Sequence, residues 1–120
     1  YDASYHNFRK YLEVVFTYAG SYSLAKELKK VQNIQDLRLG DVFIQGGFPG
    51  HAVLVVDMAR HSRTGEVLFL LAQSYMPAQD IHLLKNLNNS RLNPWYSIRQ
   101  VREELETPEW TFKKNNLKRF

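Results

Sequence analysis

The chain has 120 residues, no cysteine and a formal net charge of +4. This length suits one domain with a hydrophobic core, and the missing thiol excludes a cysteine nucleophile, disulfides and thiolate metal sites. The basic residues are scattered, which argues against nucleic-acid binding, and no apolar run approaches the roughly 20 residues of a membrane helix.

The first half of the chain carries two helical patterns and then two strands. Residues 5–19 place apolar side chains at three- and four-residue steps, which predicts an amphipathic helix, and residues 21–30 predict a shorter one. Residues 31–39 form a connector. Residues 42–45 and 51–58 are apolar runs separated by a glycine-rich turn, and they predict two strands. The unbroken apolar character of the second run favours a strand buried on both faces.

The second half predicts further short strands. Residues 59–66 are charged and contain Thr-Gly near their end, so they predict a hairpin loop before a third strand. The strands expected from there on are 67–72, 81–84, 95–101 and an edge strand at 110–112. Helices followed by antiparallel strands predict an α+β domain over residues 1–120, with N-terminal helices packed on an antiparallel meander sheet.

His51 is the leading candidate for chemistry, because it stands where a glycine loop ends and a buried strand begins. If the second and third strands form a hairpin, His51 lies next to Gln73 or Ser74. The side-chain carbonyl of Gln73 would then fix the tautomer and orientation of the imidazole. The alternative is structural: His51 is a hydrogen-bonded strand-end residue, and Gln73 only caps the end of its strand.

Other candidates are weaker. Asp41 is expected to bond backbone amides in the glycine loop. Two histidines and a carboxylate suit a transition metal, but His51, Asp80 and His82 have no recognised metal spacing, and we predict no metal and no cofactor. The glycine loop lacks the lysine and the helix of a phosphate-binding loop. Four aromatic side chains either line a groove or pack in the core. These are Tyr75, Trp95, Tyr96 and Trp110.

Several phrases resemble an uncharacterised family of bacterial envelope proteins, known only as a domain of unknown function. These phrases are YLEVVFTYAGSYSL, GDVFIQGGFPGHAVLVVDMA, LLAQSYMPAQDIHLLKN, PWY and TPEWTF. Members of that family are usually longer, and the chain begins with Tyr1. The resemblance therefore implies the C-terminal part of a longer protein in the bacterial cell envelope, either periplasmic or on the surface.

A remoter resemblance is to the papain-like cell-wall peptidases of the NlpC type. It rests on Ala19-Gly20 at a helix end, the phrase LRLGDVF at residues 37–43, and His51 at the start of a strand. It implies a papain-like core in which Gln73 orients the catalytic histidine. The cysteine position of those enzymes falls near Phe8, so the nucleophile of acyl transfer is missing.

From these observations we expect a cysteine-less cleft that binds a cell-envelope peptide or glycan without catalysis. The expected ligand contacts are His51, Gln73, Asp41, Ser74, Tyr75 and Trp95. The alternative is a hydrolase of amide or ester bonds, with His51 as general base and Gln73 as the residue that orients it. No nucleic-acid partner is expected, and the oligomeric state is left open.

Overall fold

The structure is a computed structural model that describes residues 28–45, 51–74 and 81–120. Within these ranges the chain forms short and long strands and three 3₁₀ helices. The strands are β1 (Lys29–Lys30), β2 (Val42–Gln45), β3 (His51–Arg60), β4 (Val67–Ser74), β5 (Ile81–Leu83), β6 (Tyr96–Ser97), β7 (Glu104–Glu106), β8 (Thr111–Lys113) and β9 (Leu117–Arg119). The 3₁₀ helices are η1 (Ile34–Asp36), η2 (Ile98–Gln100) and η3 (Lys114–Asn116).

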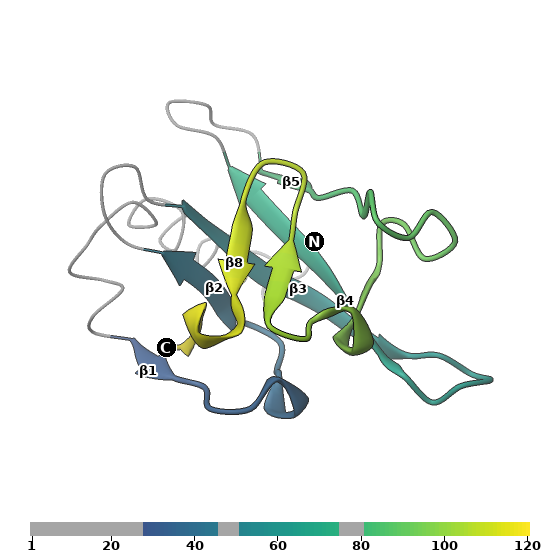
Figure 1. The fold of residues 1–120 in the computed structure, drawn as a ribbon, viewed down its shortest axis with the longest axis horizontal. Helices are drawn as coiled ribbons and strands as arrows, with labels where there is room; N and C mark the ends of the chain where they lie inside the picture. The colour runs from purple at the N-terminus through teal and green to yellow at the C-terminus, as the bar shows by residue number, and fades with distance from the viewer. Residues whose placement is uncertain (1–27, 46–50, 75–80) are drawn as a thin grey trace, which may run out of the picture.

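An antiparallel sheet in the order β1-β9-β2-β3-β4-β5 organises the described residues, and β6 pairs with β4 as well. β2 to β5 are neighbours in sequence order, whereas β9 enters between β1 and β2. The C-terminus therefore lies beside β1 (Figure 1). β7 and β8 form a separate hairpin, which crosses in front of the sheet in the same view.

The middle of the sheet is apolar on both faces. Val53, Leu54 and Val55 of β3 are each 0% exposed, although successive side chains of a strand point to opposite faces. This explains why the sequence of β3 does not alternate between apolar and polar residues. The register shifts between Val55 and Asp57, where Val56 forms a bulge. Beyond the bulge the β3–β4 ribbon extends as an arm past the rest of the sheet (Figure 1).

Two groups of buried side chains correspond to the two faces of the sheet. The first includes Phe43, Val53, Phe69 and Leu71, and the β7–β8 hairpin packs on it through Leu105 and Phe112. The Phe43 and Phe112 ring centroids are 6.1 Å apart. The second group lies on the opposite face and consists of Val42, Ile44, Ala52, Leu54 and Ala72. The hairpin therefore covers the face to which the side chain of His51 belongs, since residues 51, 53 and 55 share one face.

The predicted α+β, papain-like fold is wrong. The described residues contain no α-helix and are organised as an antiparallel β-sheet with an added hairpin. The helix predicted at 5–19 lies outside the described residues. The helix predicted at 21–30 is contradicted at its end, because Lys29–Lys30 forms β1 and pairs with β9. Backbone hydrogen bonds with the C-terminal strand, distant in sequence, override the local helical pattern there.

The strands of the central hairpins are confirmed. β2, β3 and β4 coincide with the predicted runs within two residues at each end, and the arm between β3 and β4 is the predicted hairpin loop. The strand predicted at 95–101 is only partly present. It shortens to β6 and turns into η2, because the Ser97 side chain accepts the backbone N–H of Arg99 and caps the 3₁₀ helix.

Candidate functional site

His51 and Gln73 are in direct contact, as the sequence predicted. β3 begins at His51, and Gln73 is the last residue but one of β4. Because Leu54 pairs with Ala72, the antiparallel register brings the start of β3 beside the end of β4. The distance from His51 Nε2 to Gln73 Oε1 is 2.8 Å. The predicted proximity is confirmed, and the roles of the two residues stay predictions.

The contact defines which nitrogen of the imidazole carries a proton. Gln73 is 1% exposed, and its carbonyl oxygen is the atom that faces the ring. A carbonyl oxygen only accepts, so His51 Nε2–H is the donor. In the neutral ring, Nδ1 then keeps its lone pair and serves as a hydrogen-bond acceptor. The buried carboxamide thus defines which imidazole nitrogen donates and which accepts.

Two aromatic rings from the β7–β8 hairpin pack against the imidazole. The Trp110 centroid lies 5.3 Å from that of His51 with an interplanar angle of 21°, and the Phe112 centroid lies 6.0 Å away at 26°. The Trp110 and Phe112 centroids are only 6.5 Å apart, so the three rings form a triangle. The two aromatic rings therefore do not sandwich the imidazole from opposite faces. They form a wall on one side of it.

Gln45 completes the cluster. It is the direct cross-strand partner of His51, so the two side chains lie on the same face. The indole Nε1–H of Trp110 donates to Gln45 Oε1 at 3.2 Å. An indole N–H can only donate, so the oxygen of this carboxamide must face Trp110 and its NH₂ group points elsewhere. We call His51, Gln73, Gln45, Trp110 and Phe112 the His51 cluster.

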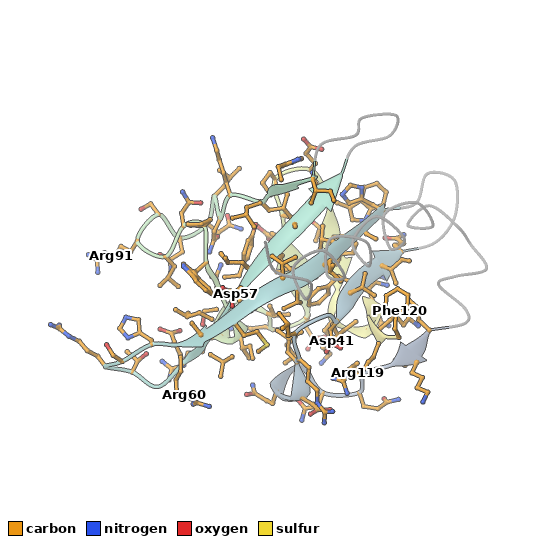
Figure 2. The ribbon with its side chains drawn as sticks, turned by 180° about the vertical axis from the view of Figure 1, so that it is seen from behind. Asp41, Asp57, Arg60, Arg91, Arg119 and Phe120 are labelled. Carbon is orange, nitrogen blue, oxygen red and sulfur yellow. The ribbon has the colours of Figure 1, made fainter. Side chains whose placement is uncertain are left out.

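Asp41 does not belong to the His51 cluster. It precedes β2, whereas His51 pairs with the last residue of that strand. Its Oδ1 and Oδ2 each accept a hydrogen bond from Arg119 at 2.8 Å, and Oδ2 also accepts the backbone N–H of Arg38 at 2.8 Å. Figure 2 shows Asp41 and Arg119 side by side. Asp41 thus bonds a backbone amide in the turn before β2. Residues 46–50 of the glycine loop, where its bonds were predicted, lie outside the described residues.

The remaining predicted ligand contacts, Trp95, Ser74 and Tyr75, are not found in the His51 cluster among the described residues. Trp95 precedes β6, which pairs with Leu68 and Phe69 of β4, four residues and more from Gln73. At about 3.3 Å per residue this separation exceeds 10 Å along the strand. Ser74 pairs with Ile81, and its side chain is outside the description, as are Tyr75 and Asp80.

His82 is the cross-strand partner of Gln73 and so shares its face of the sheet. Among residues 28–45, 51–74 and 81–120, no group of three His, Asp or Glu side chains is placed to hold a metal ion. In the same part of the chain, no helix has the length and apolar character needed to span a membrane.

Sequence reasoning missed Gln45 and Phe112 and treated Trp110 only as one of several aromatics. The available signal was the two-residue spacing of Trp110 and Phe112, which puts both rings on one face of a strand. That spacing does not show what the face packs against. The docking of a hairpin that begins 53 residues after His51 is a long-range contact, and it leaves no local signature.

The comparisons with known proteins place the chain in a family. The family model described as Domain of unknown function (4846) matches residues 1–119. The chain belongs to the DUF4846 family. The domain-of-unknown-function family expected from the sequence phrases is thereby confirmed at that level. No curated protein and no solved structure matches this DUF4846 chain.

Proposed function

We propose that the chain is a binding domain that takes a peptide or glycan of the bacterial cell envelope at the His51 cluster, without catalysis. The observation that supports this most is the 2.8 Å hydrogen bond between His51 Nε2 and Gln73 Oε1. It holds an imidazole with an accepting nitrogen next to an aromatic wall. Ligand sites are usually lined by apolar and aromatic side chains with a small number of placed polar groups.

The envelope setting of the ligand is the part of the proposal that rests on sequence alone. Its support is the set of phrases around residues 40–59, 70–86 and 107–112, together with the LRLGDVF phrase that resembles the NlpC-type peptidases. The absence of cysteine from the whole chain favours binding over acyl transfer through a thioester.

The binding proposal is tested by nuclear magnetic resonance with labelled histidine and glutamine side chains. Titration with muropeptide fragments should give saturable shifts of the His51 ring and of the Gln73 carboxamide. His61 lies in the turn of the β3–β4 arm and is a matched internal control, because its Nδ1 accepts backbone N–H groups of that turn. Unchanged His51 and Gln73 signals up to the solubility of the fragments contradict the proposal.

The second candidate function is a hydrolase, favoured by the tautomer that Gln73 imposes. His51 Nδ1 would accept a proton from a water molecule, and the water oxygen would attack the carbonyl carbon of an amide or ester. The same proton would then pass to the leaving amine or alcohol. A screen of amide and ester substrates with the wild type, His51→Ala and His61→Ala tests this. Loss of turnover in His51→Ala alone supports it, and equal rates in all three proteins exclude it.

A further inference from the structure

The His51 cluster offers a pair of hydrogen-bonding groups with fixed, opposite polarity. The carbonyl oxygen of Gln73 accepts the Nε2–H of His51, which leaves Nδ1 of the neutral ring as an acceptor. The indole N–H of Trp110 donates to the carbonyl oxygen of Gln45, which leaves the Gln45 NH₂ group as a donor. While the imidazole is neutral, neither group can reverse its role without breaking the hydrogen bond on its other side.

These two groups are also adjacent. Gln45 and His51 are direct partners in the β2–β3 ladder, and the Cβ atoms of such a pair are about 4.5–5.5 Å apart on the same face. Gln45 is exposed and His51 is half-buried, so both can be reached from solvent. The cluster therefore presents one acceptor and one donor, side by side, at the end of the β2–β3 ribbon.

The described members of the His51 cluster carry no carboxylate, ammonium or guanidinium group. Its hydrogen-bonding groups are two carboxamides, an imidazole and an indole. A ligand group that enters beside the buried Gln73 loses part of its hydration, and a charged group there would lack an oppositely charged side chain from the cluster. The arrangement favours an uncharged polar group.

We infer that the His51 cluster recognises one residue of an extended peptide. An extended residue shows its N–H and its C=O on the same edge of the chain, as in a β-strand. The N–H would donate to His51 Nδ1, and the C=O would accept from the Gln45 NH₂ group. Sugar hydroxyls both donate and accept, so they do not require a pair of fixed polarity. This inference rests on the proposed binding function and narrows its ligand from peptide or glycan to peptide.

Trp110 and Gln73 are the positioning residues of this pair. Gln73 sets the polarity of the imidazole, and Trp110 sets that of the Gln45 carboxamide while it supports the imidazole ring from one side. Loss of the indole N–H would free the Gln45 carboxamide to rotate. Gln45 would then present its oxygen as readily as its nitrogen, and the discrimination in favour of a peptide C=O would weaken.

The key variant is Gln45→Glu. A carboxylate has the size of the carboxamide and still accepts the Trp110 N–H, so the contact with the β7–β8 hairpin persists, but it no longer donates. Gln35→Glu, on the exposed helix η1, is the matched control for the added charge. The probes are a blocked alanine tripeptide, its depsipeptide analogue with one N–H replaced by ester oxygen, and an oligomer of N-acetylglucosamine.

We expect the tripeptide to bind with shifts at His51, and both the ester analogue and Gln45→Glu to lower its affinity about tenfold or more. Gln35→Glu should bind the tripeptide like the wild type. The affinity of Trp110→Phe should lie between those of the wild type and Gln45→Glu. Equal affinity of the tripeptide for Gln45→Glu and the wild type overturns the inference. Glycan binding at His51 without peptide binding also overturns the peptide inference, but it leaves the proposed binding function standing. If the peptide, the glycan and the muropeptide fragments all fail to bind, both the inference and the proposed binding function are contradicted.

Discussion

Asp41 is the only charged side chain that is buried among the described residues, at 1% exposure. It is satisfied by the two nitrogens of Arg119 and by the backbone of Arg38. The hydrogen bonds to Asp41 raise the pKa of Arg119 above its usual range. The pair joins β9 to the turn before β2, so the last strand of the chain is fixed to the sheet by charge as well as by its backbone.

Removal of the guanidinium should therefore destabilise the fold. We expect Arg119→Ala to lower the free energy of unfolding by about 3 kcal/mol, because it leaves a buried carboxylate without its counter-charge. Arg38→Ala is the matched control, since its side chain is 65% exposed and its ion pair with Asp36 is a surface pair. Such pairs contribute about 0–1 kcal/mol. Urea denaturation of the three proteins measures the difference, and equal losses in both variants would contradict the assignment.

Tyr96 gives the fold a dependence on alkaline pH. It is 0% exposed, its hydroxyl donates to the carbonyl oxygen of Lys85, and burial raises its pKa to about 12. An exposed tyrosine titrates near pH 10. The folded state therefore favours the neutral phenol. This contribution is complete below about pH 10 and is lost as the pH rises through the folded-state value.

We expect the free energy of unfolding to fall between about pH 10 and the raised pKa of Tyr96, and to fall less steeply in Tyr96→Phe. At neutral pH the same variant should lose about 1 kcal/mol, because the Lys85 carbonyl loses its donor. Urea denaturation at a series of pH values gives the slopes, and ultraviolet absorbance of tyrosinate reports the ionisation. Identical slopes for the two proteins would rule out Tyr96 as the source.

At the scale of elements, the segment between β5 and η2 is organised by a buried amide. Asn86 is 2% exposed. Its Nδ2 donates to the Trp95 carbonyl and to Gln100 Oε1, both at 2.8 Å, and its backbone N–H donates to Asn93 Oδ1 at 2.7 Å. Gln100 in turn accepts the backbone N–H of Ser97 at 3.0 Å. One side chain thus connects an irregular loop to β6 and η2.

Asn86→Ala should cost about 2–4 kcal/mol of stability, because it leaves two acceptors in a part-buried site without their donor. Asn115→Ala, at an exposed position of η3, should change the stability by less than about 0.5 kcal/mol. Thermal or urea denaturation compares the two alanine variants. A loss in Asn86→Ala no larger than that in Asn115→Ala would show that the loop does not depend on this amide.

The strands that the sequence revealed are those whose pattern is local. β2, β3 and β4 are apolar runs bounded by turn residues, and burial on both faces of the sheet accounts for that composition. β1, β7 and β9 carry two or more charged residues and read as surface segments. β7 pairs with the neighbouring β8, whereas β1 and β9 pair with strands far away in sequence. Propensity and periodicity cannot identify such partners.

At the scale of the whole molecule, the candidate site also combines contacts that follow from local sequence pattern with contacts that depend on long-range packing. His51 and Gln73 lie on consecutive strands, and hairpin geometry alone predicts their contact. Gln45 follows from the same register, once the β2–β3 pairing is fixed. Trp110 and Phe112 reach His51 because the β7–β8 hairpin folds back over the sheet (Figure 1). The aromatic wall is therefore a property of the tertiary fold and could not be assigned from the sequence.

The sheet order also predicts how local stability varies across the molecule. β3 and β4 lie in the interior of the order and bury Val53–Val55 and Phe69 at 0% exposure, so the amides of these central residues should exchange only on global unfolding. β1 and β5 end the order and contain exposed residues, so their amides should exchange through local opening. Hydrogen exchange followed by mass spectrometry should give slow uptake in residues 53–55 and 69–71 and faster uptake in 81–83. Equal protection of β5 and β3 would contradict this order, because an edge strand with one partner opens without disturbing the core.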